Sequence, residues 1–98
     1  MKFLVLWHVE PSVLRQDIVR AVLAQPSYAK KLQADGKLES RYHLVGKHGG
    51  AWIYNVDSNE ELDRLLAASP VYNLATYEVL PLAEMEDPAT VVGKPPAA

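Results

Sequence analysis

The order in which strand-like and helix-like patterns follow one another constrains this fold more than any other feature of the sequence. Short runs rich in β-branched and aromatic residues are separated by glycine-rich turns or by longer stretches with apolar residues at helical spacing. The patterns predict six elements in the order strand, helix, strand, strand, helix, strand. We expect strands at residues 3–9, 38–45, 51–56 and 75–82, a long helix between Ser12 and Asp35, and a short helix between Ser58 and Pro70.

The long helix has clear ends and one unfavourable residue inside it. Ser12 can cap its beginning, and Asp35-Gly36 can end it, because glycine readily adopts the left-handed conformation found at helix C-termini. Pro26 lacks a backbone donor, so we expect a kink or break near Ala24 and Gln25. The expected buried stripe is Val13, Leu14, Ile18, Ala21, Val22 and Leu23.

The two middle strands are separated by the turn cluster at residues 46–50, which predicts a hairpin. In strict alternation, the even-numbered positions from Leu38 to Leu44 share one face, and the odd-numbered positions from Glu39 to Val45 share the other. Pairing Val45 with Gly50 places His43 opposite Trp52. The short helix that follows begins with a capping box, in which Ser58 is followed three residues later by Glu61.

This order of elements is the β-α-β-β-α-β pattern of ferredoxin-like folds, an α+β class with both helices on one face of an antiparallel-rich sheet. Strands 3–9 and 51–56 are apolar at both parities, so the other sheet face is also apolar and needs cover. Two such sheets packed face to face form a dimeric α+β barrel, which is our prediction. We expect a single domain over residues 1–83 and a C-terminal tail at 84–98 that is flexible or depends on assembly for its order.

Charge and cysteine content exclude several classes of function. The formal net charge is −2, so there is no net positive field to attract nucleic acid. The chain has no cysteine, which excludes disulfides, thiolate nucleophiles and cysteine-ligated metals and fits the reducing cytoplasm. The apolar run at residues 3–7 is too short for a signal peptide or a membrane span, so we expect a cytoplasmic protein with no membrane partner.

Candidate catalytic residues lie where the first and last strands meet. His8 and Glu10 have the same parity, and in the usual strand order His8 lies close to Thr76, Tyr77 or Glu78. A histidine and a carboxylate within hydrogen-bond reach can transfer protons near neutral pH. The alternative is a structural polar pair, or a Glu78 side chain that extends to water at an edge strand.

Other polar and aromatic residues could bind a small molecule. Lys47 lies in a turn whose backbone amides could receive a carboxylate, although a plain hairpin turn is the alternative. Trp52, Tyr54 and Tyr77 could line a pocket for a flat ligand, or could fill a core or an interface. The three histidines lie on different elements without metal-ligand spacing, so we expect no metal site.

The second half of the chain resembles the muconolactone delta-isomerase family. The resemblance is carried by residues 46–58, Glu60, Leu62, Leu66, 70–72 and 78–82, and more weakly by 7–9. It implies a dimeric α+β barrel that can assemble further into rings. It also implies a proton shift that moves a double bond within an unsaturated lactone during aromatic degradation, without metal or organic cofactor.

The resemblance and the residues together predict a cofactor-independent isomerase of a small unsaturated lactone or related acid. His8 and Glu78 would exchange the proton with help from Glu10, and Lys47 or Arg41 would hold a substrate carboxylate. Two alternatives share the architecture. One is a noncatalytic dimeric module that is structural or binds a small ligand, and the other is a cofactor-free oxygenase acting on an electron-rich aromatic.

Overall fold

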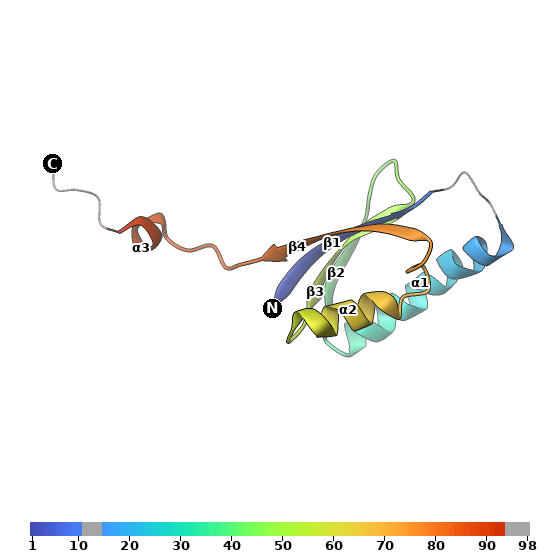
Figure 1. The fold of residues 1–98 in the computed structure, drawn as a ribbon, viewed down its shortest axis with the longest axis horizontal. Helices are drawn as coiled ribbons and strands as arrows, with labels where there is room; N and C mark the ends of the chain where they lie inside the picture. Colours follow the sequence, from blue (N-terminus) through green and yellow to red (C-terminus); the bar gives the residue numbers. More distant parts are fainter. Residues whose placement is uncertain (11–14, 94–98) are drawn as a thin grey trace.

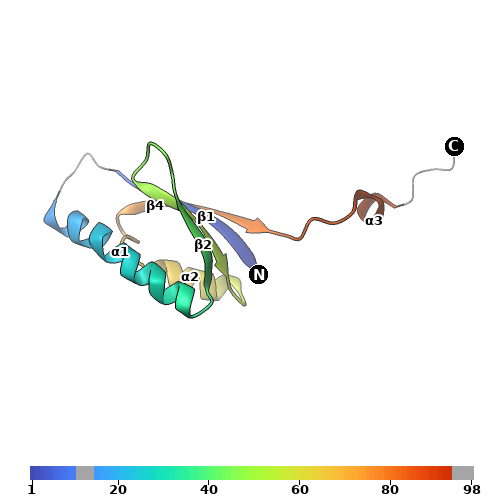
Figure 2. The same ribbon diagram turned by 180° about the vertical axis from the view of Figure 1, so that it is seen from behind.

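The computed structural model describes residues 1–10 and 15–93 and confirms the predicted α+β architecture. A four-stranded sheet in the order β2-β3-β1-β4 is antiparallel throughout, and α1 and α2 both cover one of its faces (Figures 1 and 2). The other face carries no helix in these views; we call it the open face. The elements are β1 (Lys2–Val9), α1 (Gln16–Ala34), β2 (Leu38–His43), β3 (Gly49–Asn55), α2 (Asn59–Ala67), β4 (Ala75–Leu82) and α3 (Pro88–Val92).

The core lies between the sheet and the two helices because the alternate residues of β1 and β3 point there. Phe3 and Val5 of β1 pair with Tyr54 and Trp52 of β3, and all four side chains are buried. The helices supply Ala29, Leu32, Leu62 and Leu66 to the same cluster. Burying each large apolar side chain contributes roughly 1.5–3 kcal/mol, so this cluster is the main source of stability.

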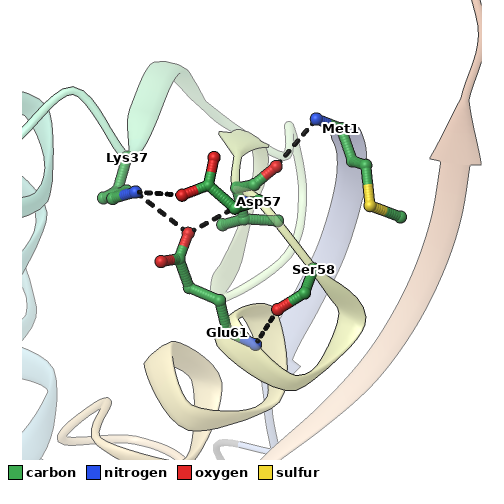
Figure 3. Close-up of polar contacts among 6 residues, drawn as sticks. Met1, Lys37, Asp57, Ser58 and Glu61 are labelled. Carbon is green, nitrogen blue, oxygen red and sulfur yellow. Dashed lines mark hydrogen bonds and ion pairs between the residues drawn. The ribbon is translucent and has the colours of Figure 1, made fainter.

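Polar contacts close the end of the domain where β1 begins (Figure 3). The Ser58 hydroxyl accepts a hydrogen bond from the Glu61 backbone N–H at 3.0 Å, which confirms the predicted cap of α2. The Glu61 carboxylate accepts from the Asp57 N–H and from Lys37 Nζ, each at 3.0 Å. The N-terminal amine of Met1 donates to the Val56 carbonyl at 2.7 Å. We call these residues, Met1, Lys37, Asp57, Ser58 and Glu61, the closed end.

Three expectations for α1 are wrong or fall outside the described residues. The helix runs through Pro26 without a break, since Pro26 is exposed and water can bond the Val22 carbonyl that lacks an amide partner. Leu23, expected in the buried stripe, is 72% exposed, and Gln25 is buried instead. Ser12, Val13 and Leu14 lie outside the described residues. The predicted end is confirmed, because Asp35 is the C-cap and Gly36 has a φ of 74°.

The hairpin register differs from the prediction because the turn between the two strands is longer than expected. β2 ends at His43, which pairs with Gly50 instead of Trp52, and Arg41 pairs with Trp52. In addition, a bulge between Leu38 and Ser40 leaves Glu39 without a partner on β3. Strict alternation fails at the bulge, so Leu38 shares the helix-covered face with Arg41 and not with Tyr42.

The chain beyond β4 runs away from the domain (Figure 1). Residues 81–90 are all exposed, including the first turn of α3, where Asp87 accepts a hydrogen bond from the Ala89 N–H at 2.9 Å. Among the described helices, none is both long and apolar enough to cross a membrane.

Candidate functional site

Two cavities lie near the end of the domain where β1 finishes. The first, the open-face cavity, occupies about 300 Å³ and is lined by residues that include Leu6, His8, Lys47, Thr76, Tyr77 and Glu78. The second, the helix-face cavity, occupies about 540 Å³ and is lined by residues that include Trp7, Val22, Gln25, Arg41, His43 and Trp52. Most of the predicted site residues are divided between them, whereas Glu10 and Tyr54 line neither.

Strand register brings His8 and Glu78 into the open-face cavity. His8 pairs with Thr76, as predicted, and Leu6 pairs with Glu78. All four residues therefore lie on the open face, and His8 and Glu78 are diagonal neighbours. Diagonal neighbours in an antiparallel pair are roughly 7–8 Å apart, which long side chains can span around a small ligand.

Glu10 extends this pair beyond the end of β1. Its Oε1 lies 3.4 Å from His8 Nε2, and the two side chains are 73% and 34% exposed. The two side chains are in contact, but their exposure to solvent keeps the contact weak. The contact therefore positions His8 without sealing it from water.

The β2–β3 loop carries Lys47 over the same cavity. The Lys47 N–H donates to the Leu44 carbonyl at 3.1 Å, and the Val9 N–H donates to the His48 carbonyl at 2.8 Å, so the loop is fixed to β1. Gly46 has a φ of 82°, a conformation that favours glycine. Among the described residues, Lys47 has no ion-pair partner, which leaves its ammonium group free to meet an anion.

The remaining predicted binding residues lie elsewhere. Arg41 and Trp52 line the helix-face cavity, and Tyr54 is a core residue that lines neither cavity. Burial raises the pKa of Tyr54 and also that of Tyr77. Tyr77 borders the open-face cavity, but its hydroxyl is buried without a hydrogen-bond partner in the described part of the chain.

Sequence reasoning missed Leu44 and Val45 in the open-face cavity and Gln25 in the helix-face cavity. Gln25 could have been found from the sequence, because it is a polar residue at helical spacing from the apolar residues Ile18 and Ala29, which are buried on the same side of α1. Leu44 and Val45 carried no such signal, since apolar residues in a predicted hairpin are ordinary. Across residues 1–10 and 15–93, no group of three or more His, Asp or Glu side chains is placed to hold a metal ion.

A family model for muconolactone delta-isomerase matches residues 1–87. The chain belongs to this family. Among relatives, the muconolactone Delta-isomerase of Cupriavidus pinatubonensis is 35% identical over 60 residues, 61% of this chain and 65% of that protein. Muconolactone Delta-isomerase 1 of Acinetobacter lwoffii is 34% identical over 58 residues, 59% of this chain and 60% of its own. The muconolactone Delta-isomerase of Rhodococcus opacus is 26% identical over 76 residues, 78% of this chain and 77% of its own.

The match thus spans about 60–65% of the length of the first two relatives. Solved structures agree on the fold of this muconolactone delta-isomerase family member. A crystal structure of muconolactone isomerase superposes with a TM-score of 0.75 at 21% identity, over 89% of this chain and 98% of the other. A 5-chloro-2-hydroxyhydroquinone dehydrochlorinase from Burkholderia phenoliruptrix, in complex with 2,5-dihydroxybenzoquinone, gives 0.69 at 20% identity, over 85% and 94%.

Proposed function

We propose that the protein is a cofactor-independent isomerase that shifts a proton and a double bond within a small unsaturated lactone or related acid. The observation that supports this most is the placement of His8, Glu78 and Lys47 around one cavity of about 300 Å³. This volume is at the lower end of the range for small-molecule sites. The family membership of the chain supports the same reaction class.

The reaction needs one proton acceptor and one proton donor. One of His8 and Glu78 removes a proton next to the lactone carbonyl, which leaves a dienolate, and the other returns a proton at the far end of the conjugated system. The double bond moves, and no atom is gained or lost. Glu10, 3.4 Å from His8, assists by holding the imidazole in position.

The ammonium group of Lys47 is suited to hold a carboxylate of the substrate. Backbone hydrogen bonds hold its loop beside the cavity, and the ammonium group is free of other ion pairs among the described residues. Negative charge develops on the substrate during proton removal, and a nearby cation stabilises that charge. Arg41 lies on the other side of the sheet and lines the helix-face cavity, so we assign it no contact with the substrate carboxylate.

A second copy of the chain would enclose this cavity. The open face carries partly exposed apolar side chains from β1, β3 and β4, among them Leu80 and Leu82 at 39% and 43% exposure. We propose that two copies pack through this face as a homodimer, with a ring as a further assembly and with residues 84–98 taking their order from it. Enclosure would exclude bulk water from the reacting dienolate. We place this activity in the cytoplasm, as the composition predicts.

The decisive test is turnover of unsaturated lactones, followed by ultraviolet absorbance and by deuterium uptake from D₂O in NMR spectra. We expect His8→Ala and Glu78→Gln each to reduce kcat by about 10²–10⁴-fold, the usual contribution of a general acid or base. Matched controls are His43→Ala and Glu84→Gln, which alter the same residue types outside the open-face cavity. If folded His8→Ala and Glu78→Gln variants keep wild-type turnover, the site assignment is wrong; if the wild type turns over no lactone, a noncatalytic binding module replaces the enzyme.

A further inference from the structure

Thr76 lines the open-face cavity, and the reaction described above gives it no role. It lies on β4 and pairs directly with His8 of β1. The residue that pairs with His8 from the other side is Gly49 of β3, which has no side chain. A Cβ atom at Gly49 would lie only 2.8 Å from the Cβ atom of His8. Thr76 is therefore the cross-strand neighbour whose side chain stands beside the imidazole.

The pairing of β1 with β4 places four side chains at the corners of a parallelogram on the open face. His8 and Glu78 occupy one diagonal. Leu6 and Thr76 occupy the other diagonal, which crosses the first. Opposite Cβ atoms are about 4.5–5.5 Å apart, and residues two apart on one strand are about 6.5–7 Å apart. A small ring held between the two proton carriers therefore has Leu6 on one side and Thr76 on the other.

The two sides of such a ring meet different chemistry. Removal of a proton next to the lactone carbonyl places negative charge on the carbonyl oxygen. Leu6 offers only apolar contact, whereas the Thr76 hydroxyl is a hydrogen-bond donor. No side-chain hydrogen bond within residues 1–10 and 15–93 involves this hydroxyl. The carbonyl oxygen of a bound lactone is therefore best placed toward Thr76.

The Thr76 hydroxyl is also positioned before the charge forms. Two heavy atoms on the Cβ of threonine restrict rotation about χ1, and the residue lies on a paired strand. The ammonium group of Lys47 ends a flexible four-carbon chain in a loop, which suits a substrate carboxylate better than one developing oxyanion. Donors fixed in advance stabilise a transition state most, because they need no reorganisation during the reaction.

We propose that Thr76 is a further catalytic residue of this site, whose Oγ1–H donates a hydrogen bond to the lactone carbonyl oxygen as the dienolate forms. This inference rests on the proposed isomerase function and adds the group that stabilises its intermediate. The Thr76 proton stays on Oγ1. The proton that moves leaves a substrate carbon for one of His8 and Glu78, and the other returns a proton at the far end of the conjugated system.

Two substitutions separate the hydroxyl of Thr76 from the shape of its side chain. Thr76→Val keeps the branched shape without the donor, so it should lower kcat and kcat/KM together by about 10–10²-fold. Thr76→Ser keeps the donor and loses only the restriction of χ1, so it should stay within about 3-fold of the wild type. Thr90→Val, on exposed α3 outside both cavities, is the matched control and should have wild-type kinetics. Wild-type kcat in a Thr76→Val variant that circular dichroism shows to be folded would overturn the inference.

The pH profile separates contact with the substrate from an indirect effect through His8. A donor to the carbonyl oxygen contributes at every pH, so Thr76→Val should lower kcat/KM by the same factor throughout the profile. A hydroxyl that acts on the imidazole instead would change the apparent pKa of the profile when it is removed. A shifted profile in Thr76→Val would therefore make Thr76 a positioning residue and refute its catalytic role.

Tetronic acid tests the same contact without turnover, because at neutral pH it is a lactone ring that carries a stable enolate. Its binding is compared with that of neutral γ-butyrolactone by isothermal titration calorimetry. Thr76→Val should weaken tetronate binding by about 10-fold or more, as expected for loss of a hydrogen bond to a charged group. The same variant should affect γ-butyrolactone much less, because its carbonyl oxygen is neutral. Unchanged tetronate affinity, or an equal loss for both compounds, would overturn the inference.

The proposed isomerase and the role of Thr76 fail in different ways. A wild type that turns over no lactone refutes the isomerase and, with it, any catalytic role of Thr76. Turnover that is lost in His8→Ala but kept at the wild-type rate in Thr76→Val refutes the role of Thr76 alone.

Discussion

The two ends of the domain are built on different principles. At the closed end, the Lys37 ion pairs and the Met1 amine connect residues far apart in sequence, and Ser58 caps α2 (Figure 3). Buried side chains of the main core cluster, among them Leu62, lie next to these contacts. At the opposite end, which we call the cavity end, the same sheet is bordered by two cavities and by the loop of Lys47, which forms no ion pair within residues 1–10 and 15–93. The comparison teaches that stability and binding are provided by different ends of the same strands, so mutations should separate them.

Truncation of the core next to the closed end should have the largest effect on stability. Leu62, in the first turn of α2, is 4% exposed and packs in the main cluster, so Leu62→Ala should lower the free energy of unfolding by about 2–5 kcal/mol. Leu23→Ala at the cavity end removes the same atoms from an exposed position and should change it by less than about 0.5 kcal/mol. Urea denaturation measures both, and equal losses would contradict the division between the two ends.

The next largest effect should come from Gly49, where the cavity end is tightly packed. A Cβ atom at Gly49 would lie 1.9 Å from the Trp7 carbonyl oxygen, which is backbone and cannot rotate away. Gly49→Ala should therefore cost about 1–3 kcal/mol or more and disturb the pairing of β1 with β3. Thermal unfolding and amide chemical shifts of residues 6–9 test this, with Gly36→Ala as a control for backbone conformation without a steric clash; undisturbed shifts in Gly49→Ala would show that the hairpin is loosely placed.

Loss of the α2 cap should have a moderate effect confined to the closed end. Ser58→Ala removes the acceptor for the Glu61 N–H and should lower the free energy of unfolding by about 1 kcal/mol. Ser27→Ala, on the exposed side of α1, serves as the matched control and should be neutral or slightly stabilising. Lactone turnover at the cavity end should be unchanged in both variants. A cap variant with altered turnover would mean that the two ends are coupled.

The smallest effect should be a pH dependence that originates at the closed end. Hydrogen bonds from Lys37 and from the Asp57 N–H lower the pKa of Glu61, so its stabilising contribution is present above the usual pKa of a glutamate and is lost as the pH falls through the lowered value. The pKa of Lys37 is raised chiefly by its hydrogen bond to Glu61, so its contribution is lost only as the pH rises through that raised value. Urea denaturation between about pH 6 and pH 3 should show a smaller loss for Glu61→Gln than for the wild type. An identical pH dependence would show that solvent screens the pair completely.

The fold was predictable because its determinants are local. The four strands, the α2 cap and the end of α1 at Gly36 each depend on a few adjacent residues, and the structure confirms them. The resemblance carried mainly by residues 46–82 also identified the family, which the family model confirms. The neighbourhood of His8 and Thr76 followed from the strand order once the ferredoxin-like pattern was recognised.

The predictions that were wrong concern features that depend on packing between distant parts of the chain. A bulge in β2 places Leu38 and Arg41 on the same face of the sheet, and no local sequence pattern indicates an extra residue in a strand. Pro26 is tolerated because α1 exposes it to water, which depends on where the sheet lies. The predicted binding residues lie on two faces because the pairing of β3 with β1 places Trp52 opposite Val5 on the helix-covered face, whereas His8 and Glu78 lie on the open face.

The bulge in β2 also bears on how the length of the chain can vary. Since Glu39 has no partner on β3, the strand contains one residue more than its pairing uses. A deletion at this point would leave Leu38 opposite Tyr54 and Arg41 opposite Trp52, with every later side chain on its present face. β3 contains no unpaired residue at this point, so a deletion within it, such as at Ala51, would move the residues after it to the opposite face of the sheet. Relatives that differ in length should therefore accept gaps at the bulge far more readily than in the central strands, and a gap there is compatible with both cavities.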